Sequence, residues 1–223
     1  PFPATIFQLF HLNCSGIQDT YTVPSPHVVP GMDGGVNQPV YNDMNAGYVA
    51  DAAGRPIVVA GSVGPTGDIM EPVGTLSHSD AVEIFHEQAE GLKAGGADVL
   101  WLETISAPEE YLAAAEAFKR AQMPWVGTMS FDTAGRTMMG LTSAAMVEMV
   151  DNIENSPIGF GANCGTGASD LLRTVLGFAA QGTSVPIVAK GNAGIPKYVD
   201  GHIHYDGTPE LMGEYAMLAR NCG

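Results

Sequence analysis

Apolar residues recur along the chain in short continuous runs, each followed by a turn and a longer segment with helical spacing. The runs are almost unbroken instead of alternating, which is typical of strands buried on both faces of a parallel sheet. They occupy residues 56–63, 97–104, 124–131, 157–164 and 186–193. Since the intervals leave room for one helix each, the pattern from about residue 50 onward predicts repeated βα units.

Capping residues indicate where several of the predicted helices begin. Ser79 is placed to cap a helix through 81–95, and Pro108 stands at a first-turn position before 109–121. Thr208, followed by Pro and Glu, opens the last helix in the same way.

Repeated βα units build either an open doubly wound sheet or a (β/α)8 barrel. No G-x-G-x-x-G motif follows the first clear strand, which argues against a dinucleotide-binding sheet. Polar and glycine-rich segments follow the carboxyl ends of the strands, and in a barrel these loops share one face. We therefore expect an α/β fold of the (β/α)8 TIM barrel type, a single domain over 1–223, with its site on that face.

The two ends of the chain depart from this pattern. Residues 1–50 are rich in Pro and Gly and contain no clear βα unit, and no eighth strand follows the helix after Thr208. A barrel usually needs about 250 residues. We expect the barrel to be incomplete in this sequence, because its N-terminal strands and strand eight are not recognisable.

Composition and charge exclude several classes of partner. The 223 residues are 45% hydrophobic and carry a formal net charge of -15, which repels nucleic-acid phosphates and anionic membranes. Neither an apolar run of about 18 residues nor a basic-then-apolar leader is visible, so we expect no membrane span and no signal peptide. Three widely spaced cysteines argue against a disulfide framework. A soluble, cytoplasmic protein with free thiols or metal-bound cysteines is expected.

Two of the cysteines are candidates for a metal site. Cys164 ends an apolar strand before a glycine-rich loop, and Cys222 lies where strand eight would end. Two thiolates at barrel strand ends suggest a shared zinc with an open position for substrate. The alternative for Cys164 is a buried thiol that only fills space in the core.

Glu103 is a carboxylate at the end of the almost wholly apolar segment DVLWLE. It must find a partner, because burying a charge alone is costly. Its candidate roles are binding an amino group or acting as a general base. The alternative is a surface or helix-capping carboxylate.

At these same loops the sequence resembles the homocysteine S-methyltransferase family, which includes the betaine–homocysteine methyltransferases and the homocysteine-binding domain of methionine synthase. The matching segments are VAGSVGPTGD, AEGLKAGGADVLWLETISAPEE, SFDTAGRTMMG, GANCG, KGNAGIP and GTPELM. Their order and spacing match from about residue 50 to the end of the sequence.

The resemblance implies a (β/α)8 barrel that binds one zinc through three cysteines. Cys164 matches the cysteine after strand six, and Cys222 matches the second of two adjacent cysteines after strand eight. The neighbour of Cys222 is absent, and Cys14 matches no cysteine of the family. The family's N-terminal DGxxGT-type strand and its TNSF-like motif are not recognisable either.

The resemblance also implies the substrates. Glu103 matches a glutamate that binds the amino group of homocysteine, and Asn192, Ala193 and Gly194 fall on a loop that helps hold this amino acid. The implied reaction transfers a methyl group from a small onium donor, betaine or similar, to the homocysteine thiol and forms methionine. Zinc would lower the pKa of that thiol, so that a thiolate is available.

Two other functions stay open at this point. One is a zinc-independent barrel lyase or isomerase that uses Glu103 and Lys190 as acid–base or Schiff-base groups. The other is a non-catalytic barrel that binds an amino acid, which the missing third cysteine favours. The sequence does not identify the methyl donor, and a homo-oligomer is neither indicated nor excluded.

Overall fold

The computed structural model of the chain describes residues 58–132 and 134–222. All of them belong to one compact unit, Asn37–Gly223, and the second unit, Pro1–Val36, lies outside the described residues. The poorly assigned segment 1–50 and Cys14 also lie outside them. The single domain over 1–223 therefore stays a prediction.

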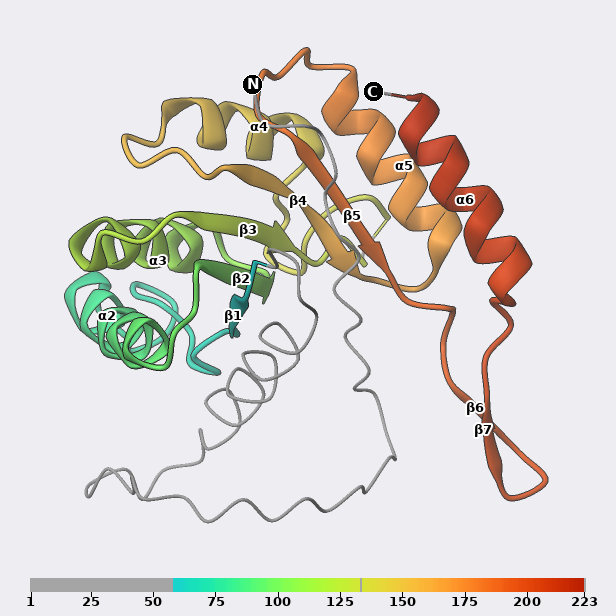
Figure 1. Cartoon of the computed structure of the whole chain (residues 1–223), viewed down its shortest axis with the longest axis horizontal. Coiled ribbons are helices and arrows are strands. Elements are labelled where there is room, and N and C mark those ends of the chain that lie inside the picture. The colour runs from blue at the N-terminus through green and yellow to red at the C-terminus, as the bar shows by residue number, and fades with distance from the viewer. Residues whose placement is uncertain (1–57, 133, 223) are drawn as a thin grey trace. The chain divides into compact units, whose positions relative to one another are not determined.

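Five parallel strands form one sheet in the order β1-β2-β3-β4-β5 (Figure 1). They are β1 (Ala60–Val63), β2 (Val99–Ile105), β3 (Trp125–Met129), β4 (Gly159–Cys164) and β5 (Ile187–Gly191). Each lies within, or within one residue of, one of the five apolar runs, so the predicted strands and their parallel pairing are confirmed. The structure shows an α/β fold with a parallel sheet.

The first four helices below connect successive strands of the sheet, and the fifth follows its last strand (Figure 1). They are α2 (His78–Ala94), α3 (Pro108–Ala121), α4 (Ser143–Asn152), α5 (Ala168–Ala179) and α6 (Pro209–Asn221). Helix α2 is capped by Ser77, whose hydroxyl accepts from Asp80 N at 3.1 Å, and not by Ser79 as predicted. The helix starts two residues earlier than the predicted cap indicates. Thr208 caps α6 as predicted.

A β-hairpin lies between β5 and α6, where the sequence pattern predicted no strand. Its strands are β6 (Lys197–Val199) and β7 (His202–His204), paired antiparallel. Asp200 and Gly201 connect them with φ of 50° and 83°. Positive φ at two central residues defines the type I′ hairpin turn that Asp-Gly favours, and this dipeptide was the available signal.

The two faces of the sheet have different surroundings. Leu100 and Leu102 of β2 point to the face that the helices cover and belong to the main core, together with Phe85 and Phe118. Val99 alternates with them and belongs to a second, smaller cluster on the opposite face. That cluster comprises Ala60, Val99 and Val126, with Trp101 and Val188 packed against it. We call this opposite face the inner face.

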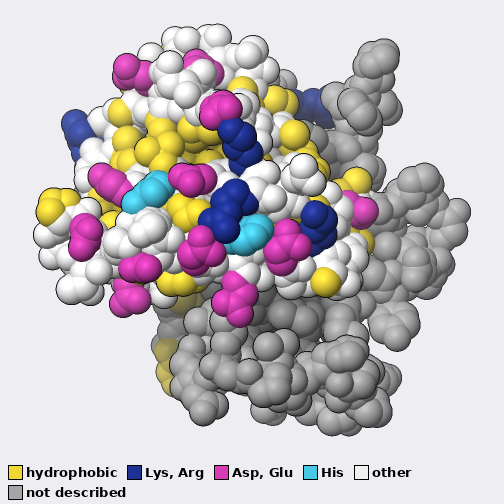
Figure 2. Space-filling view, turned by 90° about the vertical axis from the view of Figure 1, so that its left-hand side faces the viewer, with side chains coloured by type: hydrophobic (Ala, Val, Ile, Leu, Met, Phe, Trp, Pro, Cys, Tyr) yellow, Lys and Arg dark blue, Asp and Glu magenta, His cyan; other side chains and the backbone are white. Residues whose placement is uncertain are grey.

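The outer surface over α2 and α3 carries charges of both signs in alternation (Figure 2). Its ion pairs include His78–Glu116, Lys119–Glu154 and Arg120–Glu83. The hydrogen bond from Arg120 holds the pKa of the Glu83 carboxyl below its usual value. Exposed pairs of this kind contribute little stability, so this face is a solvated outer surface.

Within 58–132 and 134–222, no helix has both the length and the apolar character that crossing a membrane requires.

A glycine of β4 is required by the pairing with β5. A Cβ added at Gly161 would lie 1.9 Å from the carbonyl oxygen of Val188. We expect Gly161→Ala to lower the free energy of unfolding in urea by about 1–3 kcal/mol or more, because the backbones must move apart. Gly91→Ala in α2, where a Cβ meets nothing within 4 Å, should instead raise it by up to about 1 kcal/mol. Equal effects of the two substitutions would contradict the close approach of β4 and β5.

Candidate active site

Polar side chains gather on the inner face at the carboxyl ends of the strands. Each strand contributes one: Ser62 from β1, Glu103 from β2, Thr128 from β3, Asn163 from β4 and Lys190 from β5. The half of the same face that lies toward the amino ends of the strands is apolar. Because all five strands are parallel, their carboxyl ends form one edge, where ligands bind in α/β folds.

The Glu103 carboxylate is buried and fully engaged. Its side chain is 12% exposed, and its two oxygens have different partners. The Ser62 hydroxyl donates to Oε1 at 2.7 Å, and the Lys190 ammonium forms an ion pair with Oε2. Lys190 also lies over the ring of Trp101, 5.7 Å from its centroid. The expectation that Glu103 finds a partner is confirmed, and the reading as a surface carboxylate is wrong.

A β-bulge in β2 lies beside Glu103. The register with β3 shifts between Leu102 and Ile105, and Thr104 has a φ of 66°. Glu103 faces the inner side by the same alternation as Val99 and Trp101. The shift instead turns Ile105, which regular alternation would place on the inner face, back into the core under the helices. A bulge of this kind at a strand end redirects side chains next to active sites.

Asn163 connects three strands through its carboxamide and is only 1% exposed. Its Oδ1 accepts from Thr104 N at 2.9 Å and from the Thr128 hydroxyl at 2.8 Å. Its Nδ2 donates to Thr104 Oγ1 at 2.8 Å and contacts Cys164 Sγ at 3.1 Å. The side chain thereby fixes the ends of β2, β3 and β4 and the thiol beside it.

Cys164 is the last residue of β4 and lies at this same edge. It has a φ of 58°, and its half-buried thiol lies 3.8 Å from Thr104 Oγ1. Thr104, near the end of β2, is a second non-glycine residue with left-handed backbone at this edge of the sheet. Such strained residues gather at functional sites. The placement of Cys164 at the carboxyl edge agrees with the sequence prediction.

The loop 192–194 lies against the loop that follows Cys164. Asn192 donates from its side chain to the Gly165 carbonyl at 3.2 Å and from its backbone to the Cys164 carbonyl at 3.5 Å. The Ala193 carbonyl accepts from Gly207 N at 2.7 Å, and Gly194 has a φ of 105°. The structure therefore brings Asn192, Ala193 and Gly194 together with Cys164.

Cys222 lies elsewhere. It is the C-cap of α6 and donates from its thiol to the Leu218 carbonyl at 3.1 Å. Figure 1 shows α6 ending at the side of the sheet where β5 begins. A helix of 13 residues is about 20 Å long, so Cys222 does not face the mouth that Cys164 faces. The expected position at a strand end is wrong, because the chain through ARNC continues the helix.

The described residues do not form a complete zinc site. Zinc needs at least three protein ligands of the Cys, His or carboxylate type. In the part of the chain that the structure describes, no group of three such side chains could hold a metal ion. Cys164 offers one thiol, and the structure does not bring Cys222 to it.

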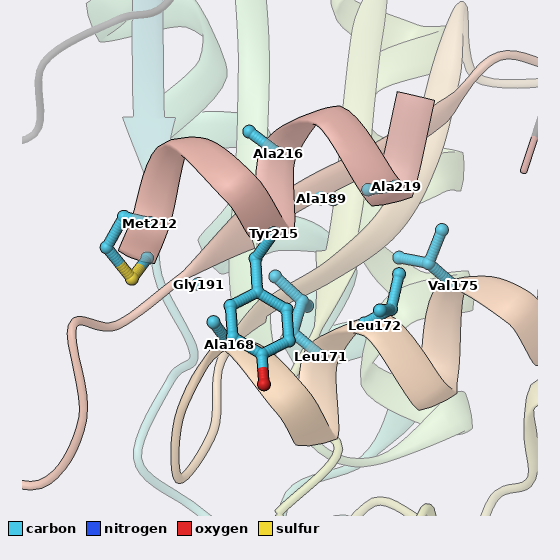
Figure 3. Close-up of a pocket in the computed structure, with 10 residues that line it drawn as sticks. All are labelled: Ala168, Leu171, Leu172, Val175, Ala189, Gly191, Met212, Tyr215, Ala216 and Ala219. Atoms are coloured by element: carbon cyan, nitrogen blue, oxygen red, sulfur yellow. The ribbon is translucent and has the colours of Figure 1, made fainter. Parts of the chain in front are cut away.

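A small apolar cavity of about 80 Å³ lies on the other side of β5, between α5 and α6 (Figure 3). Ala189 and Gly191, which flank Lys190 in β5, line it together with Leu171 and Tyr215. Since side chains alternate along a strand, the cavity faces the helices and Lys190 faces the inner side. A Cβ at Gly191 would meet Leu171 Cδ2 at 2.7 Å, so this space is part of the helix packing and not of the site.

Sequence reasoning did not assign Ser62, Thr128 or Asn163 to the site, and it considered Lys190 only as an acid–base or Schiff-base group. A signal existed for Asn163, because a buried carboxamide at the end of an apolar strand must satisfy four hydrogen-bonding positions. The partnership of Ser62 with Glu103 had none, since 41 residues separate them in the chain.

Convergent polar groups at the carboxyl edge of a parallel sheet are typical of α/β proteins that bind a ligand at the ends of their strands. The sequence model of the homocysteine S-methyltransferase family matches residues 41–222. The chain belongs to this family.

Solved structures with the same fold include the homocysteine methyltransferase MmuM from Escherichia coli in three forms. The apo form has a TM-score of 0.60 at 19% identity, covering 80% of this chain and 59% of that chain. The metallated form has a TM-score of 0.59 at 20% identity, covering 80% and 58%. The oxidized form has a TM-score of 0.58 at 20% identity, covering 80% and 59%. The present chain thus spans about three fifths of the length of these proteins.

Removing the carboxamide of Asn163 should destabilise the edge. In Asn163→Ala, the Thr104 N–H and the Thr128 hydroxyl lose their acceptor, and we expect the free energy of unfolding to fall by about 1–3 kcal/mol. Asn152→Ala is the matched control, because Asn152 is exposed and donates only to the Glu148 carbonyl. Its effect in the same urea titration should stay within about 0.5 kcal/mol. Indistinguishable curves for the two variants would rule out the connecting role of Asn163.

Proposed function

We propose that this protein transfers a methyl group to the thiol of homocysteine and forms methionine. The observation that carries the proposal is the buried Glu103 carboxylate at the carboxyl edge of a parallel sheet, at the same edge as Cys164 and the loop 192–194, in a chain of this family. We further propose that the five-stranded sheet is part of a (β/α)8 barrel, as the resemblance implies.

Glu103 and the loop 192–194 would hold the amino-acid end of homocysteine. A buried carboxylate is the group that recognises an ammonium, and Glu103 is held at a fixed position by Ser62. The loop 192–194 lies against the loop that follows Cys164. The groups proposed to hold the amino-acid end and the sulfur end of the ligand would therefore lie at the same edge.

The chemical step would be a displacement at the methyl carbon of a small onium donor such as betaine. The homocysteine thiol gives its proton to solvent water, and its sulfur forms a bond to that carbon. The bond from carbon to the onium atom breaks, and its electron pair remains on the donor, which becomes neutral at that atom. Holding sulfur, carbon and leaving atom in line supplies much of the acceleration.

Zinc belongs to the proposal as a prediction from the resemblance. Among the described residues Cys164 is the one cysteine at the carboxyl edge, and a site with three ligands would need at least one from outside 58–132 and 134–222. A cytoplasmic location likewise stays a prediction from cysteine usage.

A Schiff-base lyase is less well supported. It would need Lys190 as a free amine, whereas Lys190 stands in an ion pair with Glu103. The alternative of a non-catalytic barrel that binds an amino acid differs from the proposed function in one measurable respect, since it would form no methionine.

Methionine formation from homocysteine tests the function directly. The full chain, supplied with zinc, is incubated with homocysteine and a panel of donors: betaine, S-methylmethionine, dimethylsulfoniopropionate and methyl-folate. We expect methionine with a small onium donor. Glu103→Gln should raise the KM for homocysteine by about 10- to 100-fold with a smaller change in kcat, because a hydrogen bond to a charged group is lost.

Glu83→Gln is the control for the loss of a carboxylate, since Glu83 is exposed and paired with Arg120 on the outer surface. It should leave the KM unchanged. Homocysteine binding without methionine from any donor would establish the non-catalytic alternative, and an unchanged KM in Glu103→Gln would remove the role of Glu103.

The two cysteines should differ in their effect on metal content. We expect Cys164→Ser to lower the zinc bound per chain, measured by elemental analysis after dialysis, because its thiol lies at the site edge. Cys222→Ser should retain the zinc, because its thiol is directed to the Leu218 carbonyl within α6. Equal loss in both variants would show that Cys222 reaches the site after all.

A further inference from the structure

The site contains a charge that the proposed reaction leaves unexplained, namely the ammonium of Lys190. Its side chain is 29% exposed, and it contacts Glu103 Oε2 on one side and the Trp101 ring on another. The other oxygen of Glu103 is taken by the Ser62 hydroxyl. Glu103 therefore has a protein partner on each oxygen before any ligand arrives.

An incoming ammonium must compete with Lys190 for Glu103. Lysine carries its charge on a flexible four-carbon stem and can swing aside, and part of this side chain is open to solvent. Moving it aside separates an ion pair that is mostly buried, which leaves Lys190 without a counter-charge. A ligand that brings only an ammonium thus provides a partner for Glu103 but leaves Lys190 without a counter-charge.

An α-amino acid brings both charged groups on one carbon atom. Its ammonium can face Glu103 while its carboxylate faces Lys190, so that one internal ion pair is replaced by two pairs with the ligand. We infer that Lys190 binds the α-carboxylate of the substrate, and that the Glu103–Lys190 pair selects zwitterionic amino acids by exchanging partners with them. This inference rests on the proposed function and names a second recognition residue for it.

Three thiols of similar length separate the charges. Homocysteine carries both groups, 3-aminopropane-1-thiol carries only the ammonium, and 4-sulfanylbutanoate carries only the carboxylate. Calorimetric titration of the full chain measures their affinities without requiring turnover. We expect homocysteine to bind at least about tenfold more tightly than either analogue, because each analogue leaves one charge of the pair unpartnered.

Lys190→Met should change the order of preference. Homocysteine should bind about tenfold or more weakly, because its carboxylate loses the ammonium. The affinity for 3-aminopropane-1-thiol should stay equal or rise, because Glu103 no longer has an internal cation. Lys190→Arg retains a cation and should restore most of the preference for homocysteine over the amino thiol.

Lys197→Met is the matched control. Lys197 forms an ion pair with Asp206 beside the β6–β7 hairpin, where both side chains are more than half exposed. The three affinities should not change in this variant. Urea unfolding of every variant shows whether it is folded, and a purely structural role of Lys190 would weaken all three ligands together without changing their ratio.

The outcomes separate the two proposals. Unchanged selectivity in Lys190→Met, or equal weakening of all three ligands, overturns the inference and leaves the proposed function intact. Selective binding of homocysteine without methionine formation supports the inference and contradicts the proposed reaction. Failure of the native chain to bind homocysteine overturns both.

Discussion

The site depends on one constraint, the parallel pairing of the five successive strands of the sheet. It places the carboxyl ends of all five strands at one edge, and alternation along each strand then assigns residues to the helix-covered face or to the inner face. The helix-covered face is filled with apolar side chains. The inner face is apolar toward the amino ends of the strands and polar at the carboxyl edge. The fold itself therefore concentrates charge and hydrogen-bonding groups in one place.

Within that edge, the polar groups form two linked arrangements with different tasks. Asn163 joins the ends of β2, β3 and β4 by hydrogen bonds and is closed to solvent. Glu103 and Lys190 form a partly open ion pair held by Ser62. The first arrangement is rigid because every group in it has a partner inside the protein. The second can exchange its partners for those of a ligand, which is what recognition of a charged substrate requires.

The family and the site together favour methyl transfer to an amino-acid thiol. The edge combines a carboxylate, an ammonium and, at the end of β4, a thiol, and the proposed function assigns the two charges to the amino-acid end of homocysteine. Family membership supplies the reaction class, while the arrangement of these side chains supplies the reason why homocysteine would be the amino acid held there.

The sequence by itself determined the five strands, their parallel pairing and the family, because these follow from local apolar runs and from motifs that are contiguous in the chain. It also predicted that Glu103, Cys164 and Asn192 lie at strand ends. Only the tertiary structure decided that Ser62 and Lys190 share Glu103 and that Asn163 connects three strands. It also decided that Cys222 lies at the C-terminal end of α6, away from the carboxyl edge where Cys164 lies. These relations join residues 35 to 87 positions apart, or depend on where a helix ends. No local pattern of hydrophobicity contains that information, since it arises only when the strands are paired in register.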